Sequence, residues 1–185
     1  MDIILVFGVA GSGKSTQSQL LADELGLIWL SMGQIIRDEL TSGPLADHIN
    51  SGKLLDDEMV KGLIIKNIDK VPTGKSIVLD GFPRRISQAK WLQDYFRSRS
   101  MVIKVAVHLA ADYNIVTERL LKRGRTDDVP NAIKERFYEY ENEIKPILEF
   151  LQSENVPVLE FDAEQPINVV HNDIVSGLKK VANRL

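Results

Sequence analysis

The octapeptide Gly8-Val-Ala-Gly-Ser-Gly-Lys-Ser15 decides the fold of this 185-residue chain, because it matches the phosphate-binding pattern G-x-x-x-x-G-K-[ST]. The apolar run from Ile3 to Phe7 precedes it and predicts a short buried strand. Leucines at helical spacing follow it, and Gly26 is suited to end that helix with a positive φ. A plain glycine turn is the alternative interpretation. The strand in front and the Lys-Ser pair favour a loop whose backbone N–H groups bind phosphate.

The positions of this P-loop have expected roles at a nucleotide. Lys14 can reach the outer phosphates, and the Ser15 hydroxyl suits Mg²⁺. Asp80 ends a later apolar strand, where a carboxylate near the P-loop magnesium is expected, acting through a water. Asp80 could instead cap a turn, but a P-loop in the same chain favours the metal site. The residues expected to bind ATP in this segment are Gly8, Gly11, Ser12, Gly13, Lys14, Ser15 and Thr16.

Composition sets bounds on the class of protein. An apolar fraction of 44% and a charged fraction of 26% are ordinary for a soluble globular domain. The formal net charge of -3 provides no global attraction to nucleic acid or to an acidic membrane. The chain has no cysteine, which excludes disulfides and a thiolate zinc site, so we expect no zinc. No apolar run is long enough for a membrane span, so we expect a cytoplasmic protein.

Strands and helices are predicted to alternate along one domain, residues 1–185. This order predicts βαβ units and an α/β fold whose parallel sheet is covered on both faces. We expect Pro146 to kink or divide the longest helix. The expected strands are 2–7, 27–30, 76–80, 102–109 and 156–161. The expected helices are 14–25, 31–42, 57–70, 85–98, 112–123, 131–152 and 167–183.

Arginines gather in the segments that leave the carboxyl ends of these strands, where ligands of such sheets bind. Crowded like charges repel unless anions lie among them. A single surface arginine is more often simply solvated. Their number, their placement and the P-loop together indicate a phosphoryl transfer site, in which catalysis is mostly positioning and electrostatics. The arginines are Arg37, Arg84, Arg119, Arg123, Arg125 and Arg136.

At these residues the chain resembles the nucleoside monophosphate kinases, and the adenylate kinases most closely. Leu79-Asp-Gly-Phe-Pro-Arg84 matches the family signature, and Gln88 follows at the expected offset. Leu30-Ser-Met-Gly-Gln-Ile-Ile-Arg37 is similar to the family's L-S-T-G-D-L-L-R, and Gly52-Lys-Leu-Leu-Asp-Asp57 is similar to G-x-L-V-x-D. Arg119-Leu-Leu-Lys-Arg-Gly124 precedes Asp127-Asp128, and Arg136 follows at the family's spacing.

The resemblance implies a three-layer α/β/α P-loop fold with a five-stranded parallel sheet. It also implies a helical flap for the monophosphate, about 31–60, and a short lid, about 124–130. Arg37 and Arg84 would hold the monophosphate, Arg119 would stack on the donor base and Gln88 would read the acceptor adenine. The catalytic set would be Lys14, Arg84, Arg119, Arg123, Arg125 and Arg136, and Arg119 and Arg123 would also contact ATP. The acceptor side would comprise Ser31, Met32, Arg37, Gly81, Arg84, Gln88, Arg125 and Arg136.

The expected reaction is ATP + AMP ⇌ 2 ADP with Mg²⁺, in a monomer that binds neither nucleic acid nor membrane. A UMP/CMP kinase is the alternative within the family, although Gln88 argues against it. Met32 and Gln34 stand where the family usually has threonine and aspartate, so the contacts with the acceptor are altered. A nucleotide-binding protein with weakened catalysis is therefore a further alternative. Residues 163–166 lack the glycine often found near the donor base. A GTPase is disfavoured, because the chain has no N-K-x-D.

Overall fold

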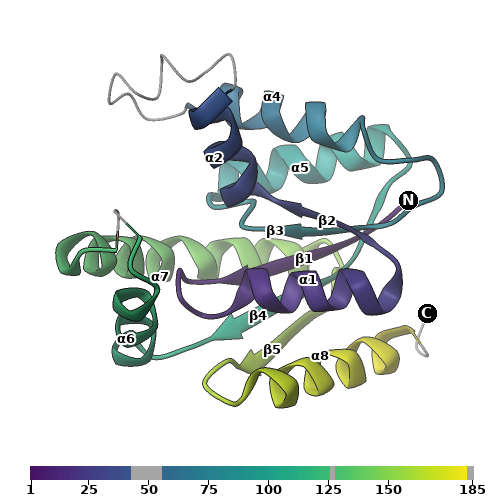
Figure 1. The fold of residues 1–185 in the computed structure, drawn as a ribbon. Coiled ribbons are helices and arrows are strands. Elements are labelled where there is room, and N and C mark those ends of the chain that lie inside the picture. The colour runs from purple at the N-terminus through teal and green to yellow at the C-terminus, as the bar shows by residue number, and fades with distance from the viewer. Residues whose placement is uncertain (43–55, 126–127, 183–185) are drawn as a thin grey trace.

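A five-stranded parallel sheet organises the chain, as expected for the α/β class. The computed structural model describes residues 1–42, 56–125 and 128–182 (Figure 1). The strand order is β2-β3-β1-β4-β5, and every neighbouring pair is parallel. The strands are β1 (Asp2–Gly8), β2 (Ile28–Ser31), β3 (Ile77–Asp80), β4 (Val102–Ala110) and β5 (Val158–Asp162).

Each helix expected from the sequence is present within the described residues, with small shifts at its ends. None of the helices in these ranges is both long enough and apolar enough to cross a bilayer. Residues 43–55 of the expected flap, which include Gly52–Leu55 of the match to G-x-L-V-x-D, lie outside the described residues, as does Asp127 in the expected lid. The helices are α1 (Lys14–Leu25), α2 (Met32–Ser42), α4 (Asp57–Ile68), α5 (Ile86–Ser98), α6 (Tyr113–Arg123), α7 (Pro130–Ser153) and α8 (Ile167–Ala182).

Strand β1 shows why the sheet carries helices on both faces. Its side chains alternate between two apolar clusters, because successive strand residues point to opposite faces. Ile3, Leu5 and Phe7 pack with buried residues of α4, α5 and α7. Val6 packs on the other side with residues of α1 and α8. The result is the three-layer arrangement in Figure 1, with the sheet between two helical layers.

The order of the strands places the P-loop at the middle of the sheet, where the connections from neighbouring strands run in opposite directions. β1 lies between β3 and β4, so the segment after Gly8 leaves the sheet at a topological switch point, the usual ligand site of such folds. Val6 pairs with Asp80, and Asp80 pairs with Ser31 across the next strand. The carboxyl ends of β1, β2 and β3 therefore bring the P-loop, Asp80 and the start of α2 to one edge.

Aspartate side chains cap the starts of two helices, and the longest helix is not divided at Pro146. The side chain of Asp56 accepts a hydrogen bond from the Met59 N–H (2.8 Å), and that of Asp112 accepts from the Asn114 N–H (2.8 Å). Helix α7 runs through Pro146 without being divided there. Buried Ile144 and other apolar residues on both sides of the proline pack against the same core, and this tertiary packing maintains the helix across the missing backbone N–H.

Candidate active site

The P-loop is shaped by glycines that no other residue could replace without strain. Gly11 and Gly13 have φ values of 90° and 88°, in the left-handed region that favours glycine. A Cβ at Gly11 would lie 2.9 Å from the carbonyl oxygen of Val116, so α6 also requires glycine there. Gly13 begins α1 without a side-chain cap. The first backbone N–H groups of α1 are therefore available to an anion, and the helix dipole favours one.

Lys14 is a cation in a site that already holds several others. Burial is the main cause that lowers its pKa, to about 8; Asp80 opposes the shift, and the positive charges of Arg84, Arg123 and Arg125 add to it. Its Nζ donates a hydrogen bond to the carbonyl oxygen of Val9 at 3.4 Å. This neutral acceptor does not compensate the positive charge of Lys14. A bound polyanion would supply the missing negative charge.

Ser15 and Asp80 form a pair suited to a hard divalent cation. The Ser15 hydroxyl donates to Asp80 Oδ2 at 2.6 Å, and Asp80 is only 1% exposed. Asp80 Oδ1 is buried and has no hydrogen-bond partner within the described part of the chain. Mg²⁺ prefers oxygen ligands and retains several waters, so a hydroxyl and a buried carboxylate with a spare oxygen fit it. The residues present are thus compatible with the magnesium expected from the sequence.

Arg123 and Arg136 are oriented by one buried carboxylate. Asp128 accepts from Arg123 Nε at 2.9 Å and from its Nη2 at 2.7 Å, while Arg136 Nη2 lies 3.5 Å from Asp128 Oδ1. The Arg125 backbone N–H also donates to Asp128 (3.2 Å). The Arg123 hydrogen bonds are the main cause that holds the pKa of Asp128 below its usual value. Asp128 therefore holds Arg123, Arg136 and the Arg125 backbone close together, a role that the sequence analysis did not assign.

Arg84 belongs to the same positive region. Its Nε donates to the carbonyl oxygen of Gly81 at 3.0 Å, which fixes the guanidinium beside the strand end. Partial loss of hydration lowers its pKa, Asp80 and Glu139 oppose that shift, and the charge of Arg136 adds to it. The residue keeps an exposed surface, so an anion can reach it and offset the repulsion from the neighbouring cations. Arg84 therefore lies just beyond the carboxyl end of β3, and its role as a phosphate contact stays a prediction.

Arg119 and Arg37 form hydrogen bonds with other parts of the protein than the P-loop. The Arg119 guanidinium donates to the carbonyl oxygens of Ala163 (2.8 Å) and Glu164 (3.3 Å), so it is tied to the loop expected near the donor base. Buried Gln17 holds the end of that loop, because its Nε2 donates to the Ile167 carbonyl oxygen (2.9 Å). Arg37 donates to Gln34 within α2 (2.7 Å).

The residues expected on the acceptor side include buried apolar and polar groups. Met32 is 1% exposed and packs in the core cluster that includes α4 and α5. Ser31 Oγ accepts from the Gln34 N–H at 3.4 Å, as a capping box predicts. Gln88 is 5% exposed; it accepts from the Arg84 N–H (2.8 Å) and donates to Asp57 (2.9 Å). Sequence reasoning gave Asp57 no role, although it is the last residue of the segment that is similar to G-x-L-V-x-D.

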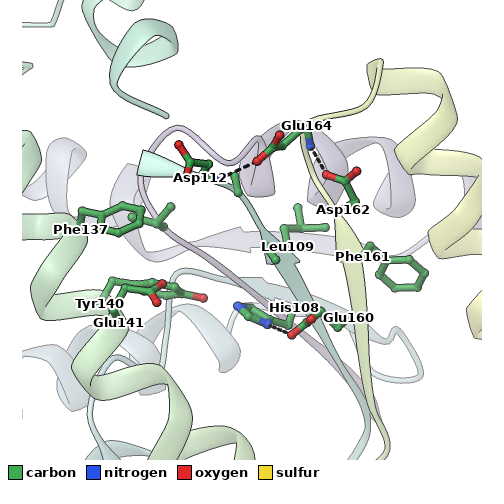
Figure 2. Close-up of a pocket in the computed structure, with 13 residues that line it drawn as sticks. His108, Leu109, Asp112, Phe137, Tyr140, Glu141, Glu160, Phe161, Asp162 and Glu164 are labelled. Atoms are coloured by element: carbon green, nitrogen blue, oxygen red, sulfur yellow. Dashed lines mark hydrogen bonds and ion pairs between the residues drawn. The ribbon is translucent and has the colours of Figure 1, made fainter. Parts of the chain in front are cut away.

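A separate cavity of about 530 Å³ opens between α7 and the ends of β4 and β5 (Figure 2). His108 accompanies Glu160 there, with Nδ1 2.9 Å from its Oε2. Of the P-loop, Val9 alone lines it, and the predicted arginines do not. Its acidic lining residues are Asp112, Glu141, Glu160, Asp162 and Glu164. The negative charge of these carboxylates would repel a phosphate group. The arginine-rich edge of the sheet at the P-loop is therefore the candidate active site.

A phosphate-binding loop at the switch point of a parallel sheet, with a buried acid beside it, defines a P-loop nucleotide-binding protein. The family model described as adenylate kinase matches residues 6–156. This chain therefore belongs to the adenylate kinase family, whose members are nucleoside monophosphate kinases and transfer phosphoryl groups between nucleotides.

Curated relatives agree with this family. An adenylate kinase of Azobacteroides pseudotrichonymphae genomovar. CFP2 is 36% identical over 154 residues, which cover 78% of this chain and 81% of that relative. An adenylate kinase of Parabacteroides distasonis is 34% identical, over 80% of this chain and 82% of that relative. An adenylate kinase of Prochlorococcus marinus strain MIT 9211 is 35% identical, over 81% of this chain and 83% of that relative.

Proposed function

We propose that this protein catalyses ATP + AMP ⇌ 2 ADP, with ATP as its magnesium complex. The observation that carries the proposal is the charge around Lys14: its half-buried ammonium is influenced by the charges of Arg84, Arg123 and Arg125. Such a set favours a polyanion larger than one phosphate. Two nucleotides whose phosphates meet end to end supply that charge, and phosphoryl transfer between them is catalysed mostly by positioning and electrostatics.

Each residue then has a defined task. The backbone N–H groups of Gly8–Ser15 and the Lys14 ammonium bind the β- and γ-phosphates of ATP. Arg84 and Arg37 orient the phosphate of AMP so that its oxygen attacks the γ-phosphorus in line. Arg123, Arg125 and Arg136 are placed to stabilise charge on the phosphoryl group in transit. No side-chain nucleophile is needed in this scheme.

Ser15 and Asp80 are the residues that would hold Mg²⁺, Asp80 through a water, on the evidence of their hydrogen bond and the spare Asp80 oxygen. The bound ion would neutralise charge on the transferring phosphates. Arg119 faces the base end of the donor, where its bonds to the 163–164 carbonyls fix the loop. We assign the flap to about 31–60 and the lid to about 124–130, within a single domain.

A coupled phosphotransfer assay with ATP and each of AMP, CMP, UMP and GMP tests the proposal. We expect the highest kcat/KM with AMP, because Gln88 offers a donor and an acceptor suited to adenine. A higher kcat/KM with CMP or UMP would replace the proposal with a UMP/CMP kinase. Binding of ATP and AMP without turnover would show a nucleotide-binding protein that has lost catalysis.

A further inference from the structure

Gln88 is held from two sides by groups from different parts of the chain. The Arg84 backbone N–H donates to its Oε1 at 2.8 Å, and its Nε2 donates to Asp57 Oδ1 at 2.9 Å. Asp57 is the first residue of α4, whereas Gln88 lies in the first turn of α5. The amide is 5% exposed, so competition from water at these bonds is weak. The segment that returns from the flap thus contacts the residue expected to read the acceptor base.

These two bonds fix which end of the amide is oxygen. A carboxylate only accepts hydrogen bonds, and a backbone N–H only donates. A reversed amide would place Oε1 against Asp57 and the NH₂ group against the Arg84 N–H, which leaves buried polar groups unpaired. Asp57 is itself anchored, because Ser87 Oγ donates to its Oδ2 (3.2 Å) and the Arg85 guanidinium lies 3.7 Å from its Oδ1.

One N–H and one oxygen lone pair of Gln88 are left for a ligand. Adenine presents a donor at its 6-amino group beside the N1 acceptor, whereas a 6-oxopurine presents an acceptor beside an N1–H donor. An amide of fixed direction therefore matches one of these patterns and opposes the other. We infer that Asp57 is a positioning residue that fixes the direction of the Gln88 amide, so that the site selects 6-aminopurine over 6-oxopurine monophosphates.

This inference rests on the proposed function, in which Gln88 faces the acceptor base, and Asp57→Asn tests it. An asparagine can offer either its oxygen or its NH₂ group, so in this variant only the Arg84 N–H still opposes a reversed Gln88 amide. The two acceptors to compare are AMP and inosine monophosphate, which differ at the 6-position and at N1. We expect the ratio of kcat/KM for AMP to that for inosine monophosphate to fall by about tenfold, the usual scale for one hydrogen bond to a charged group.

Glu58→Gln is the matched control. It makes the same change of charge in the same first turn of α4, but Glu58 is 83% exposed and pairs with Lys61 rather than Gln88. We expect the AMP to inosine monophosphate ratio to stay unchanged in this variant. A loss of kcat/KM that is equal for both acceptors in Asp57→Asn, as a structural role alone would give, overturns the inference.

A double-mutant cycle tests whether Asp57 acts through Gln88. In a Gln88→Ala background, Asp57→Asn is expected to leave the ratio unchanged, because the amide that it orients is gone. A further change of the ratio in that background contradicts the inference.

The ligand-free protein keeps this test separate from that of the proposed function. Wild-type protein that fails to phosphorylate AMP defeats the proposed function. The exchange of the Gln88 side-chain amide protons, followed by NMR, still measures the contact. Faster exchange in Asp57→Asn than in Glu58→Gln is expected, and equal exchange overturns the role of Asp57.

Discussion

The phosphate cradle (Gly8–Ser15) and the acceptor-base cluster (Met32, Asp57 and Gln88) are built in different ways. The cradle is one continuous segment, and its geometry depends on backbone torsions at Gly11 and Gly13. The cluster takes side chains from α2, α4 and α5: Gln88 donates a hydrogen bond to Asp57, and Met32 packs in the apolar core that includes both helices. Under the proposed function, the chemistry that every nucleotide shares is encoded locally, whereas discrimination between bases depends on tertiary structure.

Replacing Lys14 should produce the largest effect. We expect Lys14→Met to lower kcat by at least about 10²–10³-fold, since loss of one preorganised electrostatic group commonly costs that much. The fold should persist, because Lys14 contributes charge rather than packing. Steady-state kinetics together with a circular dichroism melt check this; a folded variant with a near-normal rate would remove Lys14 from the mechanism.

The lowered pKa of Lys14 adds a prediction about pH. The folded state disfavours the charged amine, so between pH 8 and the ordinary pKa the unfolded chain binds more protons. The free energy of unfolding contributed by Lys14 therefore rises as the pH increases from about 8 toward about 10.5, and it should not rise in Lys14→Met. Urea unfolding across this pH range measures the difference, and identical pH profiles would contradict the assignment.

Two glycine variants should sharpen the comparison by testing the backbone alone. Gly11→Ala and Gly13→Ala both place a side chain at a positive φ, at a cost of about 1–2 kcal/mol. Only Gly11→Ala also meets a neighbour, the Val116 carbonyl, because a Cβ at Gly13 has no atom within 4 Å. Denaturant unfolding should show a larger destabilisation for Gly11→Ala. An equal decrease in the free energy of unfolding for both variants would mean that contact with α6 does not restrict the residue at position 11.

Asp128 should show what side-chain assembly contributes near the lid. We expect Asp128→Asn to lower the free energy of unfolding by about 2 kcal/mol at neutral pH, because hydrogen bonds to a charged group are lost. The pKa of Asp128 is lowered in the folded state, so its contribution is present above the ordinary pKa and disappears as the pH falls through the lowered value. Unfolding at pH 7 and pH 3 should give a smaller difference at pH 3.

The acceptor-base cluster should give the smallest effects. Gln88→Asn shortens the amide and should narrow the preference for AMP over CMP by about tenfold, since an unpaired buried polar group costs about 1–3 kcal/mol. Met32→Thr should change the preference less and in the opposite direction, because Met32 supplies adaptable apolar contact rather than hydrogen bonds. Measurements of kcat/KM with AMP and with CMP check both expectations. If the ratio of the two values is unchanged in both variants, other residues select the acceptor.

The sequence predicted the fold well because its signals are local. Apolar runs marked all five strands, and glycines in a fixed pattern marked the cradle. Pro146 is the exception: a local rule predicted that it would kink or divide the helix, and packing of α7 against the core keeps the helix undivided there. Local rules therefore fail where a long buried face determines the structure.

The site was predictable only in part, for the same reason. Arg84 and Lys14 were found because motifs place them. Asp57 was given no role because its partner Gln88 lies on another helix, whereas Asp128 was noted only for its spacing although its partner Arg123 is five positions away. Gln17 was missed in the same way, because its contact with Ile167 spans 150 positions of the chain. Spacing along a sequence cannot report such contacts.

Incubation of the purified protein with Mg²⁺ and ADP alone, followed by ³¹P NMR, tests the central claim most directly. Transfer between two bound nucleotides predicts equal amounts of ATP and AMP, no inorganic phosphate, and no reaction in Lys14→Met. Release of inorganic phosphate with AMP would instead indicate hydrolysis. That outcome, or persistence of ADP in the presence of folded wild-type protein, would contradict the account.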